Sequence, residues 1–126
     1  MAAVTVDPAD AKHGYAVFNG FSRRWTNDAG YGHVYESKDA GATWTDISNN
    51  LPDVPGDDLV IAKGRLVLAT DLGVYSAAVG GGAGTAWSRF GSGLPSSSVN
   101  DLTVSPDGSY VVGVTHGRGL WKLTLP

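Results

Sequence analysis

The chain of 126 residues is long enough for one domain with a modest core, and its 18 glycines and 6 prolines are typical of a turn-rich all-β protein. A net charge of −3, with no basic cluster larger than Arg23-Arg24, gives no electrostatic reason to expect nucleic acid, and the absence of cysteine excludes disulfides and thiolate zinc sites. No apolar run reaches the roughly 20 residues of a membrane helix, so we expect no membrane insertion, and the first residues show no signal peptide.

Short runs of β-branched and aromatic residues, separated by turn residues, predict strands along the whole chain. The first four are Val4–Val6, Tyr15–Phe18, Val34–Ser37 and Trp44–Ile47. The next four are Leu59–Ala62, Arg65–Thr70, Gly73–Ser76 and Trp87–Phe90. The last three are Leu102–Ser105, Tyr110–Thr115 and Leu120–Leu123. Tight turns at Asp7-Pro8, Lys63-Gly64 and Pro106-Asp107-Gly108 join the first strand of each group to the second.

These groups are copies of one repeat. Trp44 and Trp87 are 43 positions apart, and the pair Asp58 and Asp101 shows the same offset. The first copy is longer because residues 21–32 have no counterpart later in the chain. Four strands in about 40–45 residues are typical of a β-propeller blade. We therefore predict an all-β fold of β-propeller blades in an incomplete ring. Two complete four-stranded blades would span residues 1–52 and 53–95, and a three-stranded partial blade residues 96–126.

The segment Ser37-Lys-Asp-Ala-Gly-Ala-Thr-Trp44 lies between the third and fourth predicted strands of the first blade. It resembles the Asp-box, S/T-x-D-x-G-x-T-W, of the bacterial neuraminidase (BNR) repeats. Such repeats occur in sialidases, xyloglucanase-type glycoside hydrolases and sortilin-like receptors. The ending Thr115-His-Gly-Arg-Gly-Leu-Trp121 also looks like the last blade of such a propeller. The resemblance implies a propeller fold and an extracellular or periplasmic, bacterial location, but no particular activity.

The chemistry of the Asp-box predicts a structural role. Asp39 and Ser37 can accept hydrogen bonds from backbone N–H groups across the turn, and Gly41 tolerates positive φ. Trp44 is expected to turn inward and cover the hairpin, contributing about 2–3 kcal/mol by burial. The second copy, residues 75–87, keeps the tryptophan and glycines but not the aspartate, and the box offers too few oxygen ligands for calcium. We expect no metal and no cofactor. The structural set is Ser37, Asp39, Gly41, Thr43 and Trp44.

A candidate binding surface is expected at the other end of the blades, because successive turns of an antiparallel meander alternate between the two ends of a sheet. The insertion, the links between blades and the turns between second and third strands share that end. The candidate ligand-binding residues there are Arg23, Arg24, Trp25, Tyr31, Asp57, Asp71, His116 and Arg118. Aromatic planes beside arginine and aspartate suit carbohydrate. Two alternatives stay open: Arg23-Arg24 as a solvated pair, and Trp25 folded back on its own loop. Asp58 and Asp101 are expected to cap the turns between blades.

No complete active site is predicted, so whether the chain is part of an enzyme stays open. Glu36 is the only glutamate, and its neighbour Tyr35 points to the other side of the strand, so the two cannot form the Tyr–Glu pair of a sialidase. The leading hypothesis is a propeller segment acting as scaffold or binding surface, the C-terminal part of a secreted carbohydrate-active protein. One alternative is part of a sialidase- or xyloglucanase-like glycoside hydrolase with its catalytic residues on blades not present here. Another is a lectin-like oligomer that completes its ring from several chains. The expected partners are carbohydrate and either the remaining blades or further copies.

Overall fold

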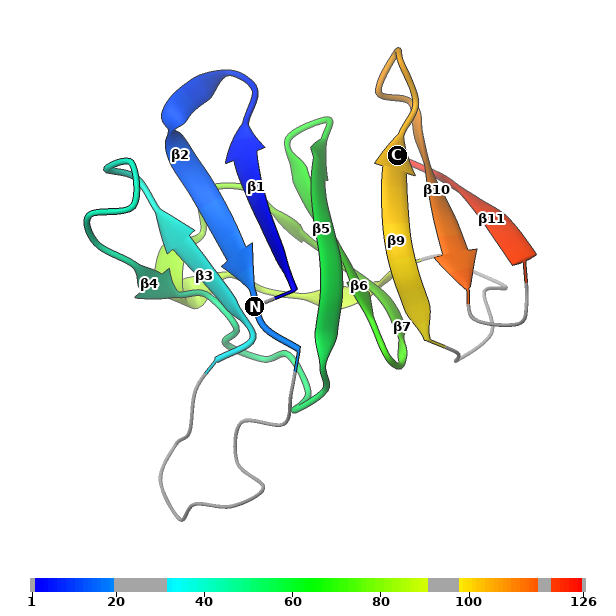
Figure 1. Cartoon of the computed structure of the whole chain (residues 1–126), viewed down its shortest axis with the longest axis horizontal. Coiled ribbons are helices and arrows are strands. Elements are labelled where there is room, and N and C mark those ends of the chain that lie inside the picture. The colour runs from blue at the N-terminus through cyan, green and yellow to red at the C-terminus, as the bar shows by residue number, and fades with distance from the viewer. Residues whose placement is uncertain (1, 20–31, 91–97, 116–118, 126) are drawn as a thin grey trace.

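The computed structural model describes residues 2–19, 32–90, 98–115 and 119–125. In this part of the chain the fold is all-β, with eleven strands in three antiparallel sheets of four, four and three strands (Figure 1). One short 3-10 turn, Gly82–Gly84, is the only helical element among these residues.

Each sheet is a meander whose strands pair in chain order. Sheet 1 contains β1 (Ala3–Asp7), β2 (Asp10–Val17), β3 (Val34–Ser37) and β4 (Thr45–Asp46). Sheet 2 contains β5 (Gly56–Ala62), β6 (Arg65–Thr70), β7 (Gly73–Ala78) and β8 (Ser88–Phe90). Sheet 3 contains β9 (Val99–Val104), β10 (Tyr110–Thr115) and β11 (Gly119–Thr124). The predicted grouping of strands is therefore confirmed.

Sheets 2 and 3 repeat each other in backbone detail. The Thr70 hydroxyl donates to the carbonyl of Gly73 at 2.8 Å, and the Thr115 hydroxyl donates to the carbonyl of Gly119 at 2.9 Å. Both glycines have positive φ, 106° and 79°, which explains why glycine follows each turn. The pairing of β5 with β6 skips Asp57, and the pairing of β9 with β10 skips the equivalent Asn100. The sequence repeat is thus a structural repeat, with a β-bulge at the same place in each first strand.

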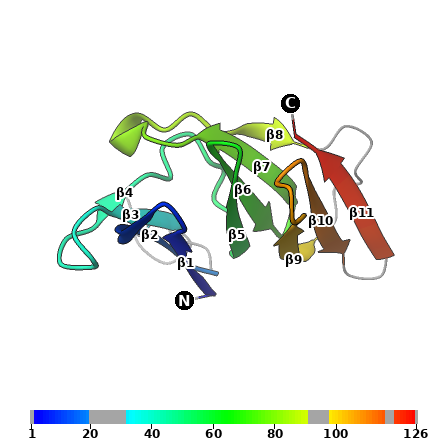
Figure 2. The same ribbon diagram turned by 90° about the horizontal axis from the view of Figure 1, so that it is seen from above.

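The two hydrophobic cores lie between successive sheets. The first joins Tyr15 and Val34 of sheet 1 to Leu68 of sheet 2, and the second joins Val67 of sheet 2 to Val111 of sheet 3. Side chains alternate along β6, so its even-numbered leucines face sheet 1 while Val67 faces sheet 3. Burial on both faces explains why β6 is an almost continuous apolar run. Seen from above, the sheets stand side by side, with β1, β5 and β9 in a row (Figure 2).

The turns fall at two ends of this row (Figure 1). The β1–β2, β5–β6 and β9–β10 turns and the β3–β4 hairpin lie at one end, which we name the hairpin end. The β6–β7 turn and the starts of β5 and β9 lie at the opposite end, which we name the link end. The β3–β4 hairpin and the carboxylates of β5 therefore occupy opposite ends of the molecule.

Candidate functional site

The β3–β4 hairpin, whose residues 37–44 resemble the Asp-box and are called by that name below, is closed by its own side chains. The carboxylate of Asp39 accepts hydrogen bonds from the Thr43 hydroxyl, from the Thr43 N–H at 2.8 Å and from the Ser37 hydroxyl at 2.8 Å. The Gly41 N–H donates to the Ser37 oxygen at 2.8 Å, and Ala40 and Gly41 both have positive φ. The Thr43 hydroxyl, followed by the Thr43 N–H and the Ser37 hydroxyl, lowers the pKa of Asp39 to about 2. Hydrogen-bond donors of the turn thus contact both oxygens of the Asp39 carboxylate, which supports a structural role.

The expectation that Trp44 is buried is wrong. Its side chain is 45% exposed, and its Nε1 donates to the Gly41 carbonyl at 3.1 Å, so the ring lies on its own turn. The neighbouring strand β4 has only two residues, both exposed, at the outer edge of sheet 1. No described residue supplies the cover that inward burial requires, so the expected 2–3 kcal/mol does not apply.

The equivalent tryptophan of sheet 2 is buried against sheet 1. Trp87 is 4% exposed, and its Nε1 donates to the Ile47 carbonyl at 2.8 Å. The side chain of Asn50 accepts from the Trp87 N–H and donates to the Trp87 carbonyl, both at 2.8 Å. Asn49 donates to the carbonyl of Thr85 at 2.9 Å. Asn49 and Asn50, in the link between sheets 1 and 2, therefore stabilise this loop, which has no aspartate of its own.

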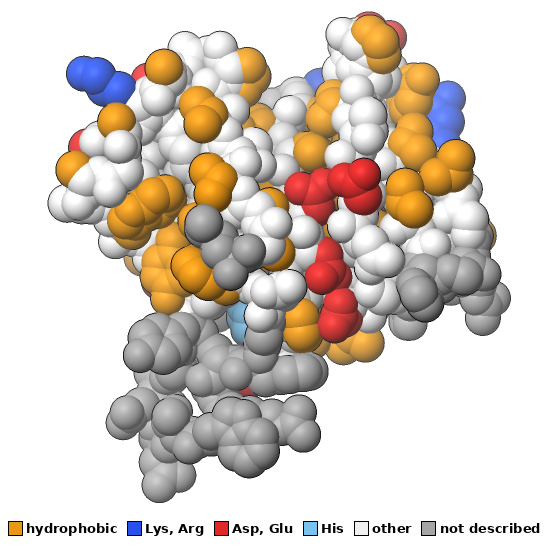
Figure 3. All heavy atoms as spheres, in the orientation of Figure 1, with side chains coloured by type: hydrophobic (Ala, Val, Ile, Leu, Met, Phe, Trp, Pro, Cys, Tyr) orange, Lys and Arg blue, Asp and Glu red, His pale blue; other side chains and the backbone are white. Residues whose placement is uncertain are grey.

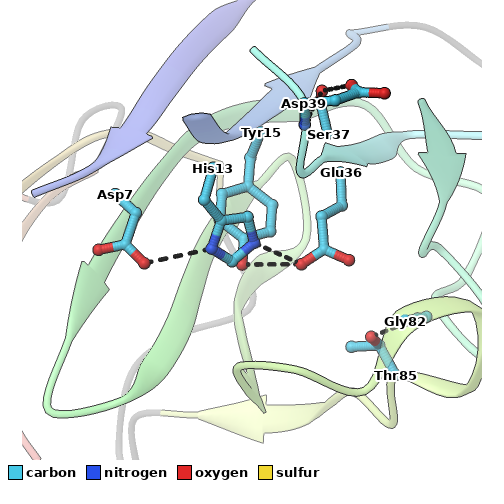
Figure 4. A network of polar contacts seen from close by, with 8 residues as sticks. All are labelled: Asp7, His13, Tyr15, Glu36, Ser37, Asp39, Gly82 and Thr85. Carbon is cyan, nitrogen blue, oxygen red and sulfur yellow. Dashed lines mark hydrogen bonds and ion pairs between the residues drawn. The ribbon is translucent and has the colours of Figure 1, made fainter. Parts of the chain in front are cut away.

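A network of buried and partly buried polar side chains lies at the hairpin end of sheet 1 (Figure 4). The imidazole of His13 lies between two carboxylates, with Nε2 2.6 Å from Glu36 and Nδ1 3.2 Å from Asp7. The Tyr15 hydroxyl donates to Glu36 at 3.2 Å. Burial first, and then the charge of Glu36, raises the pKa of Tyr15. This phenol stays protonated and fully buried, so it is a hydrogen-bond donor within the interface of sheets 1 and 2 and not an accessible nucleophile.

Sequence reasoning missed the partner of Glu36. Tyr35 does lie on the other side of β3, where it meets the Phe18 ring edge-on at 5.6 Å. Tyr15 instead reaches Glu36 because it is directly opposite it in the pairing of β2 with β3. The strand register, which a single sequence does not reveal, was the missing signal.

Two of the eight predicted ligand residues are brought together at the link end. Asp57 occupies the bulge of β5, and burial, followed by a hydrogen bond and charge repulsion with Asp71, raises its pKa to about 7. Asp57 Oδ2 is buried with no hydrogen-bond donor among the described residues, so the contact between the two carboxyl groups needs a shared proton. The Ser98 hydroxyl lies 3.2 Å from the Asp71 carboxylate and 2.9 Å from the side-chain oxygen of Asn100, so its one proton can be donated to either acceptor. The other six, Arg23, Arg24, Trp25, Tyr31, His116 and Arg118, lie outside the described residues.

Asp58 and Asp101 do not cap turns, contrary to expectation, because both lie within strands. Asp58 accepts from the Leu59 N–H and, across the seam between sheets 2 and 3, from the Leu102 N–H, each at 2.9 Å. Asp101 accepts from the same Leu102 N–H at 3.0 Å. Burial is the largest cause that raises the pKa of Asp58, and the Leu102 N–H opposes it. Acidic side chains gather over β5 and β9 in Figure 3, and this seam explains why.

In the part of the chain that the structure covers, no three His, Cys, Asp or Glu side chains are grouped to hold a metal ion. The same part contains no helix with the length and hydropathy that crossing a membrane requires. Comparisons with protein-family models, with curated proteins and with solved structures each return no match.

Proposed function

We propose that the chain is a scaffold segment of an Asp-box β-propeller, in which each sheet is one blade, and that its link end presents a carbohydrate-binding surface. The observation that carries this proposal is the repeated packing of sheet on sheet, with one core between sheets 1 and 2 and a second between sheets 2 and 3. Propeller blades pack face to face around an axis lined by their first strands. The row of β1, β5 and β9 agrees with that arrangement (Figure 2).

Direct bonds between the first strands support the blade assignment. The Thr5 hydroxyl donates to the Leu59 carbonyl at 2.7 Å, which joins β1 to β5. The Leu102 N–H donates to Asp58 at 2.9 Å, which joins β5 to β9. Strand-to-strand contacts of this kind fix the neighbouring sheets in one orientation. A rigid row of blades is what a scaffold for a binding surface needs.

The chemistry of the link end supports carbohydrate as the ligand. Asp57 and Asp71 together offer carboxylate oxygens that can accept hydrogen bonds from sugar hydroxyls. The sequence adds the aromatic and basic residues Trp25, Arg23 and Arg24 from the insertion, which follows β2 in the chain. Rings for stacking beside groups for hydrogen bonding form the usual combination for a sugar. An extracellular or periplasmic location would fit this ligand.

A glycoside hydrolase is the second candidate, because an aspartate with a pKa near 7 could act as a general acid. The geometry argues against it. The two catalytic carboxyl groups of a glycosidase stand about 5–5.5 Å apart in retaining enzymes and about 6.5–9.5 Å apart in inverting ones. Asp57 and Asp71 instead share a hydrogen bond, which leaves no room for a glycosidic bond between them. The pair is better suited to holding a sugar than to cleaving one.

A glycan array probed with the 126-residue chain tests the proposal. We expect binding to at least one glycan, and at least a tenfold loss of affinity in Asp57→Asn and in Trp25→Ala. Asp10→Asn is the matched control, since Asp10 is exposed at the start of β2, at the hairpin end. Absence of binding, or binding that neither variant changes, would contradict the proposed surface. Hydrolysis of fluorogenic glycosides would instead favour the second candidate.

A further inference from the structure

Two sheet faces of the molecule are apolar and uncovered by any described residue: the outer face of sheet 1 and the outer face of sheet 3. On sheet 1, Val4 is 58% exposed and Val6 55% exposed. On sheet 3, Val114 is 36% exposed and Leu120 72% exposed. Figure 3 shows hydrophobic side chains on both flanks of the row of sheets. Exposed apolar faces of this kind mark interaction surfaces.

The exposed residues of sheet 1 are the repeats of residues buried elsewhere. Val4 is equivalent in the repeat to Leu59, which is 1% exposed in the first core, and to Leu102, which is 5% exposed in the second. Trp44 follows the same rule, because its equivalent, Trp87, is buried against the preceding sheet. The outer face of sheet 1 therefore has apolar residues at positions equivalent to those with which sheets 2 and 3 pack on the sheet before them.

The exposed residues of sheet 3 are the repeats of the opposite half of that interface. The matching hydroxyl bonds of Thr70 and Thr115 make Ala69 equivalent to Val114. The matching glycines that follow these turns make Val74 equivalent to Leu120. Ala69 and Val74 are both 0% exposed in the core between sheets 2 and 3. The two uncovered faces are thus the complementary halves of an interface that the chain already forms twice.

Polar groups repeat in the same way. Asp58 uses Oδ1 for the N–H of Leu59 in its own strand and Oδ2 for the N–H of Leu102 in the next sheet. Asp101 repeats the first of these bonds, through Oδ1 to Leu102. The second bond would go to the N–H of Val4, the equivalent of Leu102, in a further sheet 1. Lys122 Nζ lies 4.4 Å from the centre of the Tyr110 ring, a cation–π contact between neighbouring strands of sheet 3.

We propose that a second copy of this chain covers both faces, head to tail, so that sheet 3 of each copy packs on sheet 1 of the other. Two copies then form two identical contacts about a two-fold axis, and the six sheets make a closed ring. Six lies within the range of four to eight blades found in propellers. The inference rests on the stacked sheets of the proposed function and is independent of the ligand.

Sedimentation of the 126-residue chain between 1 and 100 μM tests this pairing, because each chain has a mass of 13.0 kDa. We expect a species of twice that mass. Val4→Asp and Leu120→Asp should each weaken the dimer at least a hundredfold, because each places a charge in both contacts. Leu72→Asp is the control, since Leu72 is a 46% exposed apolar residue in the β6–β7 turn, on neither face. A chain that stays monomeric throughout this range overturns the proposal.

Mixing the two aspartate variants tests the head-to-tail geometry. Each retains the face that the other has lost, so the mixture should dimerise through one intact contact and bind more tightly than either variant alone. A contact between like faces would respond to only one of the two substitutions, and that result overturns the proposal. Glycan binding by a strictly monomeric chain would leave the proposed function standing and remove only the second copy.

Cysteine cross-linking keeps the test valid if a charged variant does not fold. The chain has no native cysteine, so a double variant with Val4→Cys and Asp101→Cys contains only the two thiols of the expected contact. Mild oxidation should link two chains into a covalent dimer, whereas each single variant should stay a monomer on a denaturing gel. Failure of the double variant to cross-link, with circular dichroism showing a folded β protein, contradicts the proposed contact.

Discussion

The hairpin that closes sheet 1 and the loop that closes sheet 2 occupy equivalent places in the repeat, yet different forces hold them. In sheet 1 the turn is closed by the bonds of Asp39 and Ser37, and Trp44 remains 45% exposed. In sheet 2 the closing loop, residues 79–87, contains no aspartate, and Trp87 is 4% exposed with its N–H groups bonded to Ile47 and Asn50. Local hydrogen bonds close the turn that lacks a covering neighbour, and burial closes the one that has it. The aspartate of the box is therefore one of two solutions to the same folding problem.

Removing the two tryptophans gives the largest expected contrast. Trp87→Ala should lower the free energy of unfolding by about 3–5 kcal/mol, because it leaves a cavity between sheets 1 and 2. Trp44→Ala should cost about 1 kcal/mol or less, because much of its ring is already in solvent. Urea denaturation at a protein concentration low enough to keep the chain monomeric measures both. Equal costs for the two substitutions would refute the distinction between local and tertiary closure.

The hydrogen bonds from Asn49 and Asn50, in the link between sheets 1 and 2, test how the loop of sheet 2 is held. Asn50→Ala removes both bonds to the backbone of Trp87 and should cost about 1–3 kcal/mol, whereas Asn49→Ala removes one bond to Thr85 and should cost about 1 kcal/mol. The double variant Asn50→Ala/Trp87→Ala should cost less than the sum, because the two side chains support one loop. Additive costs in denaturant titrations would mean that Asn50 stabilises the link and not the loop.

The strands and their grouping could be predicted from the sequence because alternation and turn residues are local signals. Gly73 and Gly119, at the ends of the turns that begin at Thr70 and Thr115, are explained by the positive φ that each turn requires. The fate of Trp44 could not be predicted, because its pattern is the same as that of Trp87 and only the presence of a neighbouring sheet separates them. Whether a sheet face is covered depends on the presence of a neighbouring sheet, and the sequence of one repeat does not encode this.

The candidate site was predictable to a smaller extent. The link end was reached by counting turns, and that counting brought Asp57 and Asp71 together. The pair Tyr15 and Glu36 and the bridge from Asp58 to Leu102 were missed, because both depend on strand register or on contacts between sheets. A carboxylate in a strand gives no sign in the sequence that its partner is a backbone N–H of the next repeat.

The Asp-box carboxylate should lose its stabilising role in acid. The pKa of Asp39 is about 2 in the folded chain against 3.8 as the ordinary value, so its contribution is complete above pH 3.8 and disappears as pH falls through 2. At pH 7, Asp39→Ala should lower the Tm by about 5 °C. Thermal melts from pH 7 to pH 2 should show the two curves converge below pH 4. A difference that persists at pH 2 would mean that the substitution acts through strain at Ala40 and Gly41, not through the carboxylate.

Asp57 at the link end should behave in the opposite sense, and its effect should be the smallest. Its folded pKa is about 7 against 3.8, so the folded chain binds the proton more tightly, and stability falls as pH rises from about 4 to 7. Solvent screens this partly exposed pair, so we expect a fall of only about 1 kcal/mol.

Asp57→Asn keeps the shape of the side chain and removes the charge, so the variant should show a flatter profile and exceed the parent chain in stability at pH 8. Denaturant titrations at pH 5 and pH 8 measure this, with Asp10→Asn as the exposed control. A profile unchanged by Asp57→Asn would assign the proton to Asp58, whose pKa is also raised. The carboxyl group that makes stability depend on pH would then lie at the seam between sheets 2 and 3.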